Sequence, residues 1–169
     1  MEPGDVRADL SPRTGEEMPD KKTIEKAREL KKEGKSASAQ AGEFVREEID
    51  AIREGKHGAR SAKQAIAIGL SEARRAGIDL PPPKKGKYSD DVREKAKDDL
   101  EKGREDPNAK PDPTRSRATT KALHYESTDT VSHEALSIQA KSAAKSRSPA
   151  DRSESAKKAA ETRKRKVEK

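Results

Sequence analysis

The stretch 61-SAKQAIAIGLSEARRAG-77, followed by 78-IDLPPPKKGKY-88, is the best-bounded part of the sequence and decides the fold class. Ser61 suits a helix N-cap, Gly77 suits the left-handed residue after a helix, and the prolines at 81–83 stop the helix from continuing. Helical periodicity places Ala62, Ile66, Gly69, Leu70, Ala73 and Ala76 on one stripe, with Lys63, Gln64, Ser71, Arg74 and Arg75 mostly outside it. The stretch therefore predicts a helix with one packed face and one basic, solvated face.

A second amphipathic helix is predicted upstream, beginning at Ser36 or Ser38 and ending at Gly55. Its apolar stripe is Ala41, Val45, Ile49 and Ile52, with Phe44 and Glu48 at the edge. Residues 56–60 have a length that suits a connection between antiparallel helices. We therefore predict a helical hairpin over 38–77, in which the stripe of the first helix meets Ile66 and Leu70.

The rest of the chain divides by composition into five regions. They are a disordered tail (1–19), a helical core region (20–88), a charged helix after Ser89 (89–102), a proline-rich linker (103–118) and a basic Ala/Lys-rich helical C-terminal region (119–169). The first helix of the core region is predicted to begin at its cap Asp20 and to end at Gly34. The linker is the predicted main boundary. Ser148 and Pro149 predict the start of its last helix.

Composition limits the size of any core. Only 28% of the residues are hydrophobic and 42% are charged, which predicts an all-α protein with a small helical hairpin core, additional amphipathic helices and substantial disorder. The absence of cysteine excludes disulfides and thiolate metal sites and fits a reducing compartment. The sequence has neither a signal-like apolar segment nor a membrane-spanning run, so we expect a cytoplasmic protein.

Signatures of catalysis and cofactor binding are missing from the sequence. No glycine-rich phosphate loop occurs, and His57, His124 and His133 lack the spacing of metal ligands on a helix. The sequence Ser132-His133-Glu134 has the residue types of a hydrolase triad, but sequence neighbours cannot adopt its geometry. We expect a non-enzyme without metal or cofactor.

The charge of +7 is concentrated in two segments, since residues 61–89 carry six basic and two acidic side chains and residues 119–169 carry twelve and seven. Two separated basic blocks favour a polyanionic partner, with nucleic acid, DNA above RNA, preferred over an anionic membrane. The expected phosphate contacts are Lys56, Arg60, Lys63, Arg74, Arg75, Lys84, Lys85, Lys87, Lys157, Lys158, Arg163, Lys164 and Arg165.

Binding independent of base sequence is expected, because Phe44, Tyr88 and Tyr125 are too far apart in the sequence to form a stacking platform. Phosphate contacts require only charge and reach. The predicted function is thus nucleoid-associated, histone-like DNA binding. The alternative is a hydrophilic stress-protection or adaptor protein that binds a protein partner or a second copy of itself, with its charge runs as ordinary solvated surface.

The segment Glu43–Gly77, EFVREEIDAIREGKHGARSAKQAIAIGLSEARRAG, resembles a family of small uncharacterised bacterial proteins defined by a domain of unknown function. The hallmark of that family is a KQAIAIGLSEARRAG-like segment after a helix that begins with Glu-Phe. The resemblance implies a bacterial or phage origin and a soluble, basic, loosely histone-like protein, and it carries over no established activity. Residues 155–166, SAKKAAETRKRK, are similar to the tails of other basic bacterial proteins.

Overall fold

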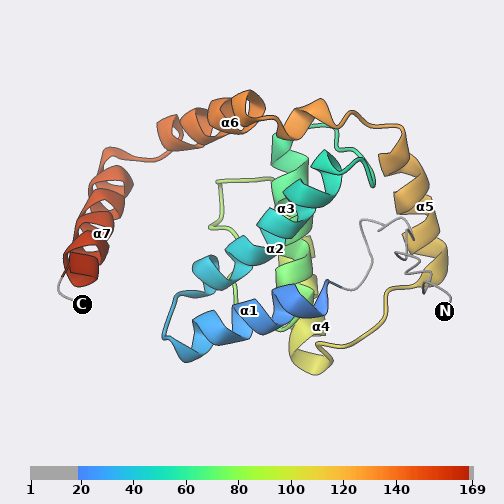
Figure 1. The fold of residues 1–169 in the computed structure, drawn as a ribbon, viewed down its shortest axis with the longest axis horizontal. Helices are drawn as coiled ribbons and strands as arrows, with labels where there is room; N and C mark the ends of the chain where they lie inside the picture. Colours follow the sequence, from blue (N-terminus) through green and yellow to red (C-terminus); the bar gives the residue numbers. More distant parts are fainter. Residues whose placement is uncertain (1–18, 168–169) are drawn as a thin grey trace, which may run out of the picture. The chain divides into compact units, whose positions relative to one another are not determined.

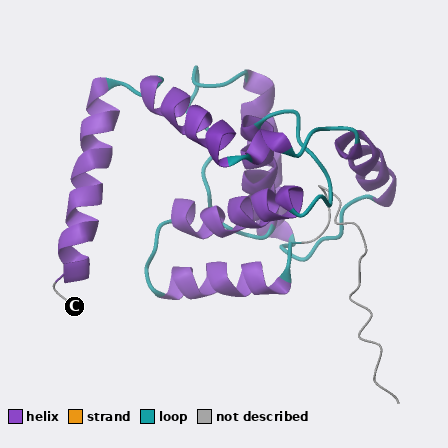
Figure 2. Ribbon diagram, turned by 45° about the horizontal axis from the view of Figure 1, so that its top comes forward, coloured by secondary structure: helices purple, strands orange, loops and turns teal. Residues whose placement is uncertain are grey.

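The computed structural model describes residues 19–167, and the side chains of 165–167 are outside this description. The expected disordered tail (1–19) therefore lies, except for Pro19, outside the described residues. The α-helices are α1 (Lys21–Lys32), α2 (Ala37–Arg53), α3 (Ala62–Arg75), α4 (Asp90–Glu105), α5 (Pro113–His124), α6 (His133–Lys145) and α7 (Pro149–Val167), with a short 3₁₀ turn, η1 (Asp129–Val131). No strand occurs between residues 19 and 167, which confirms the all-α class (Figure 2).

The helix boundaries follow the local sequence closely. Asp20, Ser36 and Ser61 each accept a hydrogen bond from a backbone N–H in the first turn of α1, α2 and α3. Gly34 and Gly77 follow α1 and α3 with φ of 73° and 83°, values that favour glycine. The N-termini of α1, α2 and α3 and the C-termini of α1 and α3 therefore confirm the predicted helix boundaries.

The central packing is between α2 and α3, with α1 against α2 and α4 against α3 (Figure 1). The expected helical hairpin is therefore formed. Its deepest large side chains are Phe44 and Ile52, whereas Val45, Ile49 and Ile66 are only half-buried. The prediction that placed Phe44 at the edge of the stripe was wrong, because the α2 face that packs is rotated toward Phe44 and Ala51.

Two glycines permit the close approach of the three central helices. A Cβ at Gly69 would lie 2.7 Å from the Cα of Val45 in α2, and a Cβ at Gly103 would lie against the carbonyl oxygen of Arg74 in α3. Gly103 is therefore inside α4 rather than beyond its end, and α4 continues to Glu105. Ala96 and Leu100 are buried and α4 contacts α3, so this charged helix packs against the hairpin.

The expected linker over 103–118 is shorter in the structure. Since α4 ends at Glu105 and α5 begins at Pro113, only residues 106–112 connect them. The chain separates into two compact units, Met1–Ser132 and His133–Lys169, so the main boundary is not in the linker as predicted but after η1. The second unit contains α6 and α7.

The loop between α2 and α3 is covered by residues 123–131, a segment that we call the strap. The N–H groups of Gly58 and Ala59 donate to the carbonyl oxygens of Leu123 and Ser127. Val131 is fully buried, in one cluster with Ile52, Ala59 and Ala65. Under this cover His57 Nε2 lies 3.6 Å from Glu48 Oε2, and both side chains are buried. The strap thus encloses a polar pair at one end of the hairpin.

Candidate nucleic-acid interface

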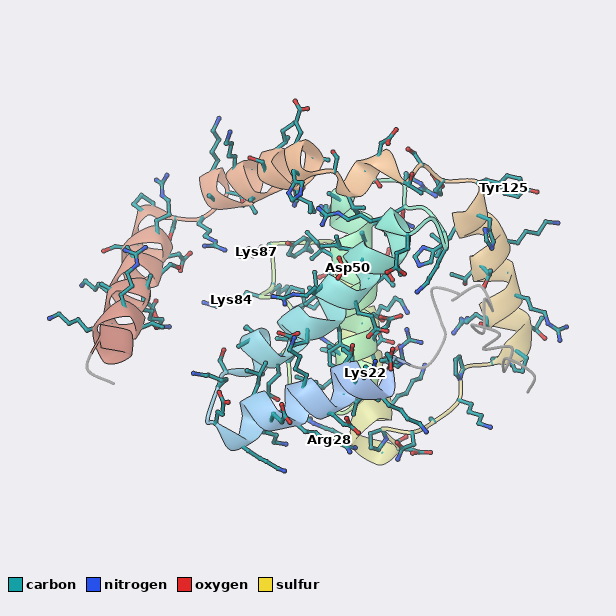
Figure 3. All side chains as sticks on the ribbon, viewed as in Figure 1. Lys22, Arg28, Asp50, Lys84, Lys87 and Tyr125 are labelled. Carbon is teal, nitrogen blue, oxygen red and sulfur yellow. The ribbon has the colours of Figure 1, made fainter. Side chains whose placement is uncertain are left out.

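Three lysines project from the loop between α3 and α4 and form what we call the basic arm: Lys84, Lys85 and Lys87. All three are exposed, and none has an ion pair with another described residue. Figure 3 shows Lys84 and Lys87 pointing away from the helices. The preceding prolines at 81–83 keep the chain extended, so the arm emerges as a short, charged, solvated segment.

Arg74 holds the base of the basic arm instead of facing solvent. Its guanidinium donates through Nε to the carbonyl oxygen of Leu80 at 3.1 Å and through Nη2 to that of Pro81 at 3.4 Å. The residue is only 7% exposed, and burial lowers the pKa of Arg74 while nearby Asp99 raises it. The expectation that Arg74 lies on a solvated face was therefore wrong, because its guanidinium is buried against the base of the arm and positions it.

Lys63, on the first turn of α3, lies beside the end of the basic arm. Its Nζ is 5.1 Å from the centroid of the Tyr88 ring, a cation–π geometry that leaves the ammonium group in water. Tyr88 is 42% exposed. The structure therefore brings Lys63 to the arm, although the two are separated by about 20 residues in the sequence.

The two acidic residues of the central basic block are both neutralised or hidden. Asp79 accepts a hydrogen bond from Arg104 at 2.5 Å, and Glu72 is buried. The charge of Asp79 is therefore balanced locally by Arg104, and the Glu72 carboxylate lies away from the solvent that surrounds the arm. Sequence reasoning counted both acids against the block and could not identify Arg104 as a partner of Asp79.

The other cations expected in unit Met1–Ser132 are engaged with acidic residues. Lys56 Nζ lies 2.7 Å from Glu54, Arg60 Nε lies 3.6 Å from Glu126, and Arg75 Nε lies 3.9 Å from Asp99. These pairs lower the local positive field. The structure thus does not bring Lys56, Arg60 and Arg75 into one free surface with the arm.

In the second unit α7 carries the expected C-terminal block. Lys157, Arg163 and Lys164 are exposed, and Lys158 donates to Glu154 at 2.7 Å, a hydrogen bond that raises the pKa of Lys158. The side chain of Arg165 is outside the described residues. α7 is exposed along its described length, so its cations are open to a partner from several sides.

Among residues 19–167 no group of three histidine or acidic side chains is arranged to hold a metal ion. In the described part of the chain, each helix is too short or too polar to cross a bilayer. The carboxylates of the structure serve instead as caps and ion-pair partners, as Asp20 and Glu54 illustrate.

A family of unknown function, DUF6496, has a model that matches residues 17–85, about two fifths of the chain. The matched region covers α1, α2, α3 and most of the basic arm. The resemblance to an uncharacterised family is confirmed to that extent, while bacterial origin and histone-like character stay predictions. No curated protein and no solved structure matches the chain.

Proposed function

We propose that this protein binds the phosphate backbone of nucleic acid, DNA in preference to RNA, without catalysis and largely without reading base sequence. The observation that carries the proposal is the basic arm. Lys84, Lys85 and Lys87 are exposed, have no acidic partner among the described residues and extend from a base that Arg74 fixes. In this proposal the protein acts as a nucleoid-associated, histone-like protein.

The chemistry of the arm suits phosphate better than bases. Each lysine ammonium is a point charge that can replace a condensed counterion on a duplex, and this release drives binding at low salt. Tyr88 is the single aromatic ring beside these lysines in the described part of the chain, and it is already stacked under Lys63. The arm therefore has no row of rings on which successive bases could stack.

In this proposal two groups of cations contact phosphates. In the first unit they are Lys63 and the basic arm, and in the second unit they are Lys157, Arg163 and Lys164 on α7. Lys56, Arg60, Arg75 and Lys158 have acidic partners that a phosphate would have to displace, so we assign them a minor role.

The test is the salt dependence of duplex binding by the full chain, measured by fluorescence anisotropy with DNA and RNA duplexes of unrelated sequence. The variant is Lys84→Gln/Lys85→Gln/Lys87→Gln. If these lysines contact phosphates, the slope of log K against log salt becomes shallower by up to about 2.7 for B-DNA, that is about 0.9 for each contact.

The matched control is Arg28→Gln/Lys31→Gln/Lys32→Gln, which removes the same charge from exposed positions of α1 that have no ion pair with another described residue. An equal change of slope in both variants would show that net charge alone acts. Absence of duplex binding at low salt would contradict the proposal and favour the alternative of an adaptor or stress-protection protein.

A further inference from the structure

A cleft of about 280 Å³ is lined by α3, α4, the 106–112 connection that leads into α5, and Pro19, and none of the basic-arm lysines lines it. Its wall contains five basic and four acidic side chains. Because these charges nearly balance, their numbers alone do not show which kind of ligand the cleft would bind. The acidic and basic members of the wall differ in how far they are already engaged.

The acidic side chains of the cleft are used within the protein. Asp112 Oδ1 accepts hydrogen bonds from the backbone N–H groups of Thr114 and Arg115 at 2.9 and 2.8 Å, as the N-cap of α5. Asp106 Oδ1 accepts from the N–H of Asn108 at 2.9 Å.

The remaining two acids lie deeper. Asp99 is buried, accepts from Ser71 at 2.5 Å and lies near Lys95 and Arg75. Glu72 is also buried and has a partner. No group of three acidic or histidine ligands suited to a metal ion occurs among the described residues, so the cleft does not have the donor set of a cation site.

Three cations of the cleft are exposed and have no ion-pair partner in the described structure: Lys102, Lys110 and Arg115. They come from α4, from the connection and from the first turn of α5, so they surround the cleft from separate segments. Their spare donors are therefore available to one molecule that enters between them.

Arg75 adds a fourth donor at the wall. Its Nε atom is buried and has no hydrogen-bond acceptor among residues 19–167, and it lies 3.9 Å from a carboxylate oxygen of Asp99. A buried N–H without an acceptor is energetically costly. Apart from the long ion pair with Asp99, Arg75 Nε has no hydrogen-bond acceptor among the described residues, and a negatively charged ligand in the cleft would offer it one.

From the unengaged donors and the engaged acids, we infer that this cleft binds a small polyanion, such as a compact molecule with two or more phosphate or carboxylate groups. The volume is at the lower edge of the roughly 300–1,000 Å³ of typical ligand pockets, so it fits a compact ligand. Guanidinium groups suit phosphate and carboxylate equally, because both present paired oxygens. This site is separate from the basic arm and does not depend on the proposed function.

Isothermal titration of the full chain at constant ionic strength tests the inference, with inorganic pyrophosphate in one series and citrate in another. Saturable heat with either probe supports a polyanion site, and the probe that binds more tightly shows whether phosphate or carboxylate is preferred. In Lys110→Gln/Arg115→Gln the affinity falls about tenfold or more, as expected when charged hydrogen bonds are removed. Backbone amide NMR shifts place the probe at Arg75, Ala109 and Arg115.

The control is Lys84→Gln/Lys85→Gln, which removes the same charge from the basic arm. Its affinity for either probe stays within about twofold of the original chain, whereas its duplex binding weakens. No saturable heat with either probe, or an equal loss of affinity in both variants, overturns the inference. Circular dichroism of each variant establishes that it folds, which is expected because all four residues are exposed.

Discussion

Replacing Gly103 by alanine is expected to separate α3 from α4. A Cβ at this position would lie 1.9 Å from the carbonyl oxygen of Arg74, whereas an ordinary carbon–oxygen contact is about 3.3 Å. The two helices would therefore have to move apart by about 1.4 Å, since the contact is with backbone that cannot rotate away. Gly103 thus sets the distance between the two helices.

The change in the free energy of unfolding caused by Gly103→Ala is the sum of a stabilising effect and destabilising effects. Alanine is the better helix former by about 1 kcal/mol, which favours the variant. Against it, overpacking costs about 1–3 kcal/mol, and loss of packing at Leu100, now 7% exposed, adds up to about 1.5–3 kcal/mol. Together these terms amount to about 0–5 kcal/mol, and we expect the free energy of unfolding to fall by about 2–3 kcal/mol, measured by urea denaturation with circular dichroism.

Gly42→Ala is the matched control, because Gly42 is also inside a helix and a Cβ there would meet nothing within 4 Å. This variant is expected to be more stable by about 0.5–1 kcal/mol. If Gly103→Ala were stabilised by a similar amount, the close packing of α3 on α4 would be refuted. Equal destabilisation of both variants would contradict the reasoning as well.

Three further substitutions test the hairpin. Glu48→Gln removes the carboxylate beside buried His57, and the free energy of unfolding should fall by about 1–3 kcal/mol, measured by thermal denaturation. An unchanged midpoint would show that the carboxylate of Glu48 does not stabilise the buried pair. Arg74→Met removes the donors to the carbonyl oxygens of Leu80 and Pro81, so the free energy of unfolding should fall by about 1.5–3 kcal/mol. Amide hydrogen exchange in the basic arm should also become faster. Exchange rates equal to those of the original chain would contradict the role of Arg74 in holding the arm. Ser61→Ala should cost about 1 kcal/mol through loss of the α3 N-cap, and urea midpoints that coincide would contradict it.

The sequence was sufficient to predict the helices of the hairpin, because caps and stops are local signals. Ser61 and Gly77 bound α3 by their own conformational preferences, with no help from distant residues. The same reasoning failed at Gly103, where local propensity predicts a stop but α3 requires a residue without a side chain. A contact between helices has no signature in a single segment.

The cationic surface was predicted less well than the helices. Sequence position identified the lysines at 84, 85 and 87, since a proline-bounded loop is exposed by necessity. Arg74 was misplaced because helical periodicity does not reveal that the following loop turns back over α3 and offers carbonyl oxygens. The cleft between α3, α4 and α5 was missed entirely, since its cations are dispersed over a near-neutral stretch of sequence.

The strap has a consequence for the order of folding. The hairpin is made of neighbouring segments and can form early, but Gly58 and Ala59 obtain their acceptors only from Leu123 and Ser127, more than sixty positions later. During synthesis from the N-terminus, the connection between α2 and α3 must therefore remain open to water until those residues leave the ribosome. A nascent chain arrested before residue 123 should display His57 to solvent, and one arrested well beyond residue 131 should not.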